Sequence, residues 1–424
     1  MAPRGFGTLS LAAPSILREW QMQPKEMGFV FSITFFGLLV GSLTYGWIAD
    51  RYGRRFTIIL GTFNFGIPIL LTVWATSINE LAVLRFIGGI GVGGIVPIAY
   101  TLVSEYAPKR MRSTVTVITN SGYSLGAASG GLIAAASIPA YGWQSLYVIG
   151  AIFSFAMALV LILYLPDSAL FLALKKPNAP QLRSLAQRLL GERTLAPETR
   201  FVAVDEHEGD EIGRAGFLRL FTGMRAYATI LLWLLFVADS LGFFFLASWL
   251  PLVMENAGVS SSIASLTASL FVFAGLVGGF GIMRFLDRVG PIAFVALPII
   301  GGPAEIMIGM RGLPEPLLLT TVAIAGACLA GIHMAVYAIA VRFYPSTIRG
   351  IGVSMATVFG RAGAIVAPSV GGYLLSAHMP LQQLLVFAAL PCVATTLIGI
   401  GLGLLYRRHF DTPPTLSVAE QPAS

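Results

Sequence analysis

A few ionisable side chains lie deep inside long apolar stretches of this chain, where such groups are rare and need a reason. Arg361 lies about 14 residues into one apolar run, and Asp239 lies about 13 residues into another. A guanidinium can hold an organic carboxylate through two parallel hydrogen bonds, and a buried carboxyl group can bind and release a proton. These two residues therefore predict recognition of an organic anion and handling of a proton. Alternatively, Arg361 pairs with a carbonyl or acid of the protein, such as Asp239, and locks helix packing.

Further polar and aromatic residues in the apolar runs are candidates for binding the same substrate. Histidine is the side chain whose ordinary pKa lies nearest neutral pH, and Tyr337 follows His333 by one helical turn, so an aromatic substrate could stack there; core packing explains both equally well. Arg85 lies near the end of its run, where it either attracts anions or extends its head group to the membrane surface. Asn120 and Ser124 add polar groups to another run.

The apolar runs set the fold class. The chain has 424 residues, of which 56% are hydrophobic and 11% charged, and its mean hydropathy is +0.80, whereas soluble domains carry about 25% charged residues. A helix crosses about 30 Å of hydrocarbon with about 20 apolar residues. Eleven runs are long enough to cross, at roughly 27–49, 56–76, 79–104, 112–136, 143–165, 226–254, 260–286, 290–310, 314–344, 347–378 and 380–406. A twelfth run, from Phe6 to Leu17, is too short, and the whole predicts an all-α membrane protein.

The sequence offers little for other classes of function. Cys328 and Cys392 both lie in apolar runs and predict neither a disulfide framework nor a metal site. The glycine-rich stretches lie inside predicted spans, and no strand–loop–lysine phosphate cradle occurs. Since no pattern of nucleophile and base is seen either, we expect no enzyme and no cofactor beyond a proton as coupling ion.

Basic residues are concentrated in alternate loops. Most of the 27 Lys and Arg residues fall in segments 51–55, 109–112, 175–225, 284–288, 342–349 and 407–408. Positive charge stays on the cytoplasmic side of a membrane, so the central polar stretch and the C-terminal tail are predicted to be cytoplasmic. The net charge of +7 then reflects orientation in a bacterial inner membrane and predicts no binding of nucleic acid.

The two halves of the chain repeat each other at an offset of 237 residues. Asp50-Arg51 recurs as Asp287-Arg288, and the same offset relates Ser124 to Arg361. It also pairs Pro14 with Pro251, Pro108 with Pro345, Arg112 with Arg349 and Gly126 with Gly363. Two parallel six-helix halves are therefore predicted at 1–165 and 224–406, joined by a cytoplasmic linker at 166–223 and followed by a tail at 407–424. Such halves place a substrate site at their interface near the midplane and work by rocking.

The repeat also predicts that the first helix is short. Pro251 lies about 25 residues into its run, which begins near Ala226, whereas Pro14 has only thirteen residues before it. We expect the first helix to lack about eleven residues relative to this internal template. Either the true start lies upstream or the chain is truncated.

Two sets of motifs resemble a known superfamily and one family within it. Gly46-Trp-Ile-Ala-Asp-Arg-Tyr-Gly-Arg-Arg55 resembles the signature loop of the major facilitator superfamily, and Arg85-Phe-Ile-Gly-Gly-Ile-Gly-Val-Gly93 resembles its helix-4 motif. Ser104-Glu105-Tyr-Ala-Pro-Lys-Arg110 is similar to the aromatic acid:proton symporters, as is Phe343-Tyr-Pro-Ser-Thr-Ile-Arg-Gly-Ile-Gly352. The resemblance implies a monomeric carrier in the lipid bilayer that takes up a small organic anion, an aromatic carboxylate of the hydroxybenzoate or phenylpropionate type, with protons by alternating access.

The resemblance also assigns a gating role to the charged loops. It implies cytoplasmic latches between the halves that open as the halves rock, formed by Asp50, Arg51, Arg54, Arg55, Asp287 and Arg288. Glu105, Arg112 and Arg349 are expected to belong to the same network.

One departure from the family concerns proton coupling. The family opens its first helix with an acidic pair, but the matching stretch here is Ala2-Pro-Arg-Gly5, which leaves Asp239 as the leading candidate for the proton carrier. The alternatives are a superfamily porter for another solute, such as a sugar or another organic anion, and a receptor or inactive truncated carrier. A sugar porter would carry Arg after the turn at 166–168, where this chain has Ala169.

Overall fold

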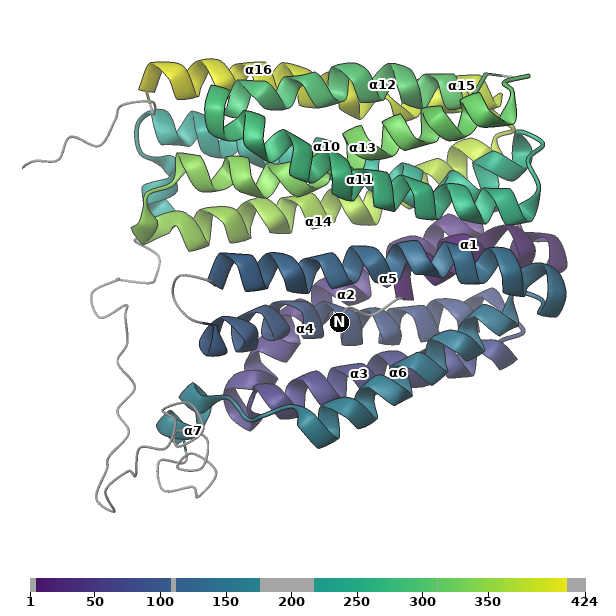
Figure 1. Ribbon diagram of the computed structural model, residues 1–424, viewed down its shortest axis with the longest axis horizontal. Helices are drawn as coiled ribbons and strands as arrows, with labels where there is room; N and C mark the ends of the chain where they lie inside the picture. The colour runs from purple at the N-terminus through teal and green to yellow at the C-terminus, as the bar shows by residue number, and fades with distance from the viewer. Residues whose placement is uncertain (1–4, 108–111, 176–216, 311, 410–424) are drawn as a thin grey trace, which may run out of the picture.

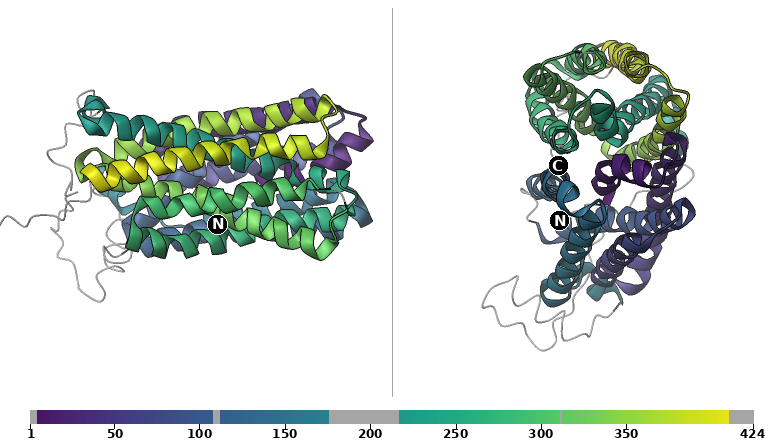
Figure 2. Two further views of the ribbon diagram at one scale, coloured as in Figure 1. Left: turned by 90° about the horizontal axis from the view of Figure 1, so that it is seen from above. Right: turned by 90° about the vertical axis from the view of Figure 1, so that its right-hand side faces the viewer.

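Two helical bundles lie side by side and make up the molecule (Figures 1 and 2). The structure is a computed structural model and describes residues 5–107, 112–175, 217–310 and 312–409. The first bundle holds α1 (Gly5–Glu19), α2 (Pro24–Tyr52), α3 (Arg54–Leu71), α4 (Ile78–Tyr106), α5 (Arg112–Tyr141) and α6 (Gln144–Tyr164), followed by the short α7 (Ala169–Lys175). The second holds α10 (Met224–Asn256), α11 (Ser261–Val289), α12 (Ala296–Ile308), α13 (Glu315–Phe343), α14 (Ser346–Ser376), α15 (Leu381–Ala388) and α16 (Leu390–His409). We call these bundles the N-half and the C-half.

The helices have the length and apolarity that the sequence predicts for a membrane protein. Within the described residues, ten are long and apolar enough to cross a bilayer. The predicted run at 112–136 forms the 30-residue α5, and the short run forms α1, which has 15 residues where its repeat counterpart α10 has 33. The predicted all-α fold of two six-helix bundles is confirmed. Most of the predicted linker at 166–223 lies outside the described residues, so its bounds stay a prediction.

The sharp break after α2 recurs after α11. Gly53 ends α2 with a φ of 94°, and Gly290, its repeat counterpart, ends α11 with a φ of 81°. Both angles lie in the left-handed region that glycine enters without steric cost. The chain can therefore turn directly into the next helix. The charged residues of the loop motif consequently lie at the ends of these helices.

Each half packs two helices together at a glycine. A Cβ atom at Gly41 of α2 would lie 2.0 Å from the carbonyl oxygen of Ile90 in α4. A Cβ atom at Gly278 of α11 would lie 1.9 Å from the carbonyl oxygen of Ala327 in α13. Small residues allow helix backbones to approach this closely in a membrane, where van der Waals packing drives association.

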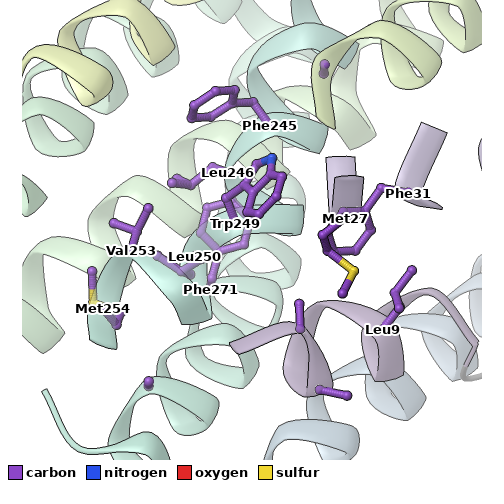
Figure 3. Packing of buried hydrophobic residues seen from close by; sticks show 14 of the residues in the cluster. Leu9, Met27, Phe31, Phe245, Leu246, Trp249, Leu250, Val253, Met254 and Phe271 are labelled. Atoms are coloured by element: carbon purple, nitrogen blue, oxygen red, sulfur yellow. The ribbon is translucent and has the colours of Figure 1, made fainter. Parts of the chain in front are cut away.

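A buried apolar cluster joins the two halves. It includes Leu9 of α1, Met27 and Phe31 of α2, and Trp249 of α10, which Figure 3 shows close together. The rings of Phe31 and Trp249 meet edge to face with centroids 5.4 Å apart, and the Trp249 indole donates a hydrogen bond to the carbonyl of Pro368. This packing holds α1, α2 and α10 together beside the site described next.

Candidate functional site

Asp239 and His333 form a pair between α10 and α13. The Nδ1 atom of His333 lies 2.7 Å from Oδ2 of Asp239, although the residues are 94 apart in the chain. Asp239 is buried, and in the described part of the chain its second carboxylate oxygen has no hydrogen-bond partner. A buried charge needs a partner, and His333 supplies one that can itself carry a proton. The two residues singled out in separate apolar runs therefore make one polar unit.

Aromatic side chains surround this pair. Phe243 of α10 stacks on the His333 ring, with centroids 4.4 Å apart and planes 7° apart. Phe244 meets the same ring edge on, and also contacts Phe35 of α2 in the other half at 4.7 Å. The aromatic side chains around His333 thus come from both halves, and they offer ring faces and edges to an aromatic molecule.

Arg361 contacts the opposite half from α14. Its Nη1 donates to the carbonyl oxygen of Leu38 at 3.1 Å and to Oγ of Ser42 at 2.9 Å, both in α2. Both acceptors are neutral, and within the described residues no carboxylate pairs with this guanidinium. This contact agrees in part with the alternative in which Arg361 pairs with a protein carbonyl and locks helix packing. Its Nε and Nη2 atoms nevertheless remain available to bind a ligand.

Tyr337 links the two polar groups. Its ring meets that of Phe236 edge to face, with centroids 5.2 Å apart, and its phenol lies close enough to Asp239 and Arg361 for their charges to act on it. The side chain is 38% exposed, so it borders open space. Asp239, His333, Tyr337 and Arg361 therefore gather at one junction of α10, α13 and α14 with α2.

One end of the interface between the halves is tightly joined, and we call it the closed end. Ser32 of α2 lies 2.7 Å from the Ser369 hydroxyl of α14 and donates to the Ile365 carbonyl. Ser262 donates to the Ala135 carbonyl at 3.1 Å. Further cross-half contacts at this end are the Lys25 amide with Ser376, Ser10 with the carbonyls of Ala247 and Ser248, and the ion pair of Arg18 with Glu255.

Two of these contacts join positions that the repeat relates to each other. Arg18 and Glu255 are 237 residues apart, and so are Ser10 and Ala247. A residue can touch its own repeat counterpart only where both lie at the axis that relates the halves. The closed end therefore has α1 and α10 meeting on this axis.

The opposite end carries the charged loops, and we call it the motif end. In the N-half, Arg54 forms an ion pair with Glu105, which also accepts a hydrogen bond from Ser168 at 2.6 Å. In the C-half, Nη2 of Arg342 lies 2.6 Å from Oδ1 of Asp287. Each pair joins two segments of one half. Within the described residues these ion pairs do not cross between the halves, and the predicted latches between the halves stay a prediction.

The other predicted gating residues are placed as follows. Arg55 lies 3.7 Å from Asp167 and donates to a carbonyl of α6, so it too acts within the N-half. Arg51 lies over the rings of Trp47 and Tyr52 at 5.6 and 5.8 Å, and Nε of Arg349 donates to the carbonyl of Tyr344. Asp50 and Arg288 are exposed at the helix ends.

Arg85 lies within the N-half. It is 4% exposed, lies 4.5 Å over the Tyr147 ring and contacts the Thr72 hydroxyl. It lines a small cavity that also borders Thr34 and Leu38 of α2. Its role in substrate binding stays a prediction. The side chains of Asn120, Ser124 and Arg112 in α5 lie outside the described residues, and their roles stay predictions too.

Arg342 and the Arg18–Glu255 pair were not singled out from the sequence. A signal for both was present, because the offset that relates the halves places Glu105 opposite Arg342 and Arg18 opposite Glu255. Each of these repeat pairs carries opposite charges, which is a pattern that repeat alignment alone can find.

Comparisons with known proteins place the chain among transporters. A family model described as Major Facilitator Superfamily matches residues 4–302 and 232–424. The chain is 34% identical to the 4-hydroxybenzoate transporter PcaK of Pseudomonas putida, over 94% of this chain and 88% of that protein. It is 33% identical to a gallate transporter of Pseudomonas putida, over 93% and 87%, and 30% identical to the 3-(3-hydroxy-phenyl)propionate transporter of Escherichia coli strain K12, over 86% and 82%.

Solved structures support the same fold. A bacterial homologue of the human lysosomal transporter Spinster superposes with a TM-score of 0.72 at 18% identity, over 97% of this chain and 96% of that one. The xylose transporter XylE of E. coli gives a TM-score of 0.66 at 14% identity, over 98% and 94%. At this level of identity the likeness concerns the fold alone.

Proposed function

We propose, given that this chain belongs to the Major Facilitator Superfamily and groups with its aromatic acid transporters, that it takes up aromatic carboxylates together with protons. It is a multi-pass membrane transporter rather than an enzyme. The proposed substrates are of the hydroxybenzoate or phenylpropionate type. The proposed location is a bacterial inner membrane, with a monomeric carrier whose C-terminus is cytoplasmic.

The observation that carries this proposal is Arg361. Its guanidinium lies at the interface of the halves beside the exposed ring of Tyr337, and its contacts in α2 are neutral oxygens. A charge within a membrane is costly, and an arriving carboxylate would offset that cost through charge-assisted hydrogen bonds. An aromatic ring attached to that carboxylate would meet the aromatic side chains that surround His333.

Proton coupling follows from the charges of the same junction. Arg361 and ionised Asp239 carry opposite charges, so a substrate anion adds one uncompensated negative charge. A proton on Asp239, whose Oδ1 has no partner within the described residues, offsets it and leaves His333 neutral, because like charges close together disfavour ionisation of the carboxyl group. Substrate binding and proton binding therefore favour each other, and this coupling is reciprocal.

Alternating access uses the two ends of the interface. Positive charge on the motif end assigns it to the cytoplasm, so the closed end faces outward. In this arrangement the substrate site opens toward the cytoplasm, and rocking of the halves would open it to the outside.

Uptake of radiolabelled 4-hydroxybenzoate into cells that express the chain tests the proposal. We expect protonophore-sensitive uptake in the wild type and a loss of at least about 100-fold with Arg361→Ala, since a charge-assisted, bidentate contact contributes roughly 3 kcal/mol. Thr320→Ala is the matched control, because Thr320 is exposed and bonds only its own helix.

Two results would contradict the proposal. Absence of uptake of this and related aromatic acids, with the protein present in the membrane, argues against the substrate class. Uptake that a protonophore leaves unchanged argues against proton coupling.

A further inference from the structure

The two ring nitrogens of His333 have different surroundings. Nδ1 faces Oδ2 of Asp239 at 2.7 Å, and a carboxylate in this position holds the imidazole proton on Nδ1. Nε2 of the neutral ring then carries a lone pair. Within the described residues Nε2 has no hydrogen-bond partner, and 25% of the His333 side chain is exposed. The structure therefore leaves a hydrogen-bond acceptor open beside the substrate site.

The orientation of this ring is fixed by its neighbours. Phe243 covers one face in a parallel stack, and Phe244 meets the ring edge on at 5.3 Å. The carboxylate of Asp239 holds one edge, and that carboxylate is itself only 2% exposed. Rotation of the imidazole would break these contacts at once, so Nε2 keeps its position on the remaining edge.

Tyr337 is near both His333 and Arg361. Its ring centroid is 6.4 Å from that of His333, and its phenol lies close enough to Arg361 for the charge of the guanidinium to act on it. An aromatic acid held by its carboxylate at Arg361 would extend its ring along Tyr337 toward His333. A substituent on the far side of the ring then reaches the imidazole edge.

We propose that Nε2 of His333 accepts a hydrogen bond from a ring hydroxyl of the transported acid, so that the carrier selects hydroxylated over unsubstituted aromatic acids. This inference rests on the proposed function, because it needs the carboxylate at Arg361. His333 is the residue that recognises the hydroxyl, and Asp239 is a positioning residue that fixes the tautomer. No bond is formed or broken beyond the hydrogen bond itself.

The expected preference is about tenfold, which corresponds to one well-made hydrogen bond in a partly buried site. Its chemical signature is donor dependence. A hydroxyl group donates to Nε2, whereas a methoxy group at the same ring position keeps the oxygen but has no proton to donate.

Displacement of radiolabelled benzoate from the purified full-length protein tests the inference. The competitors are benzoate, 3- and 4-hydroxybenzoate and their methoxy counterparts. For the wild type we expect at least one hydroxybenzoate to bind about tenfold more tightly than benzoate, with its methoxy counterpart close to benzoate. In His333→Phe, which keeps a ring between Phe243 and Phe244, the preference for hydroxybenzoate over benzoate should fall from about tenfold to none, whatever the absolute affinity for benzoate. Thr320→Ala again serves as the control.

The possible outcomes separate the two proposals. If aromatic acids bind but the hydroxyl preference is absent, or survives in His333→Phe, the recognition of the hydroxyl by His333 is overturned and the proposed function stands. If the methoxy compounds bind as tightly as the hydroxy compounds, the acceptor role of Nε2 is overturned. If no aromatic acid displaces or binds, both proposals fail. Should His333→Phe not fold, the ligand series on the wild type still decides.

Discussion

The two halves share their packing but differ in their charges. Gly41 approaches the Ile90 carbonyl in the N-half as Gly278 approaches the Ala327 carbonyl in the C-half, and all four positions are related by the repeat. The residues proposed to bind the substrate have no such counterpart. Arg361 corresponds to Ser124, and His333 corresponds to Val96. The duplicated scaffold therefore provides two similar helix bundles, and the residues proposed to bind the anion and the proton, Arg361, Asp239 and His333, all lie in one of them.

The ion pairs at the motif end show the same contrast in a sharper form. Glu105 pairs with Arg54 in the N-half, and Arg342, at the repeat position of Glu105, pairs with Asp287 in the C-half. Each half thus has an ion pair at its own loop. The end of α4 contributes the acid of the pair in the N-half, whereas the end of α13 contributes the base in the C-half. If the motif end closes as the closed end does, Glu105 and Arg342 approach each other with complementary charges.

The largest expected effect concerns the shared packing. Gly41→Val and Gly278→Val each force a methyl-bearing side chain into a backbone carbonyl, which costs about 3 kcal/mol or more. Both variants should lose most of the folded protein recovered by size-exclusion chromatography in detergent, and to a similar degree. Gly46→Val and Gly281→Val are the controls in the same two helices, because a Cβ atom at either position meets nothing within 4 Å. If only one of the two variants lost folded protein, the helix packing of the two halves would not be equivalent.

Charge reversal at the motif end should have the next largest effect. Glu105→Arg and Arg342→Glu each break a pair within one half and place like charges together, so uptake should fall about tenfold or more, since like charges juxtaposed in one site cost over a kcal/mol. The double variant Glu105→Arg/Arg342→Glu keeps both within-half conflicts but restores opposite charges across the interface. We expect its uptake to exceed that of either single variant.

A second double variant distinguishes the alternatives. Arg54→Glu/Glu105→Arg restores the pair within the N-half but leaves the arginine introduced at position 105 to face Arg342 across the interface. If this variant recovers uptake and the cross-half swap does not, the ion pairs act only within each half, and the approach of Glu105 to Arg342 across the interface is wrong.

The smallest effect is expected at the closed end. Arg18 pairs with Glu255 across the halves, but its side chain is 61% exposed, so the pair contributes about 1 kcal/mol or less. Arg18→Ala should open this end about two- to fivefold more often, measured as the rate of thiol labelling of a cysteine placed at Ser32, which lies in the cross-half contact with Ser369. Cys328 and Cys392 are buried and give little background. An unchanged labelling rate would show that apolar packing alone holds this end shut.

The sequence predicts the frame better than the site. The apolar runs, the 237-residue offset and the glycine of each loop motif are local or repeated signals, and they lead to the two bundles and their breaks at Gly53 and Gly290. Asp239 and His333 could each be recognised as unusual, but their pairing depends on how α10 packs against α13, and no spacing in the chain encodes it. The contact of Arg361 with Leu38 likewise arises only when the halves assemble.

The contacts on the axis have a consequence for how such a molecule can arise. An assembly of two identical halves would bring the same side chain to both sides of its axis, so a position equivalent to Arg18 would face a second arginine. An attractive pair at that point requires two halves with different residues. The ion pair of Arg18 with Glu255 therefore requires that the two copies have diverged after duplication. A symmetric homodimer could not form this ion pair.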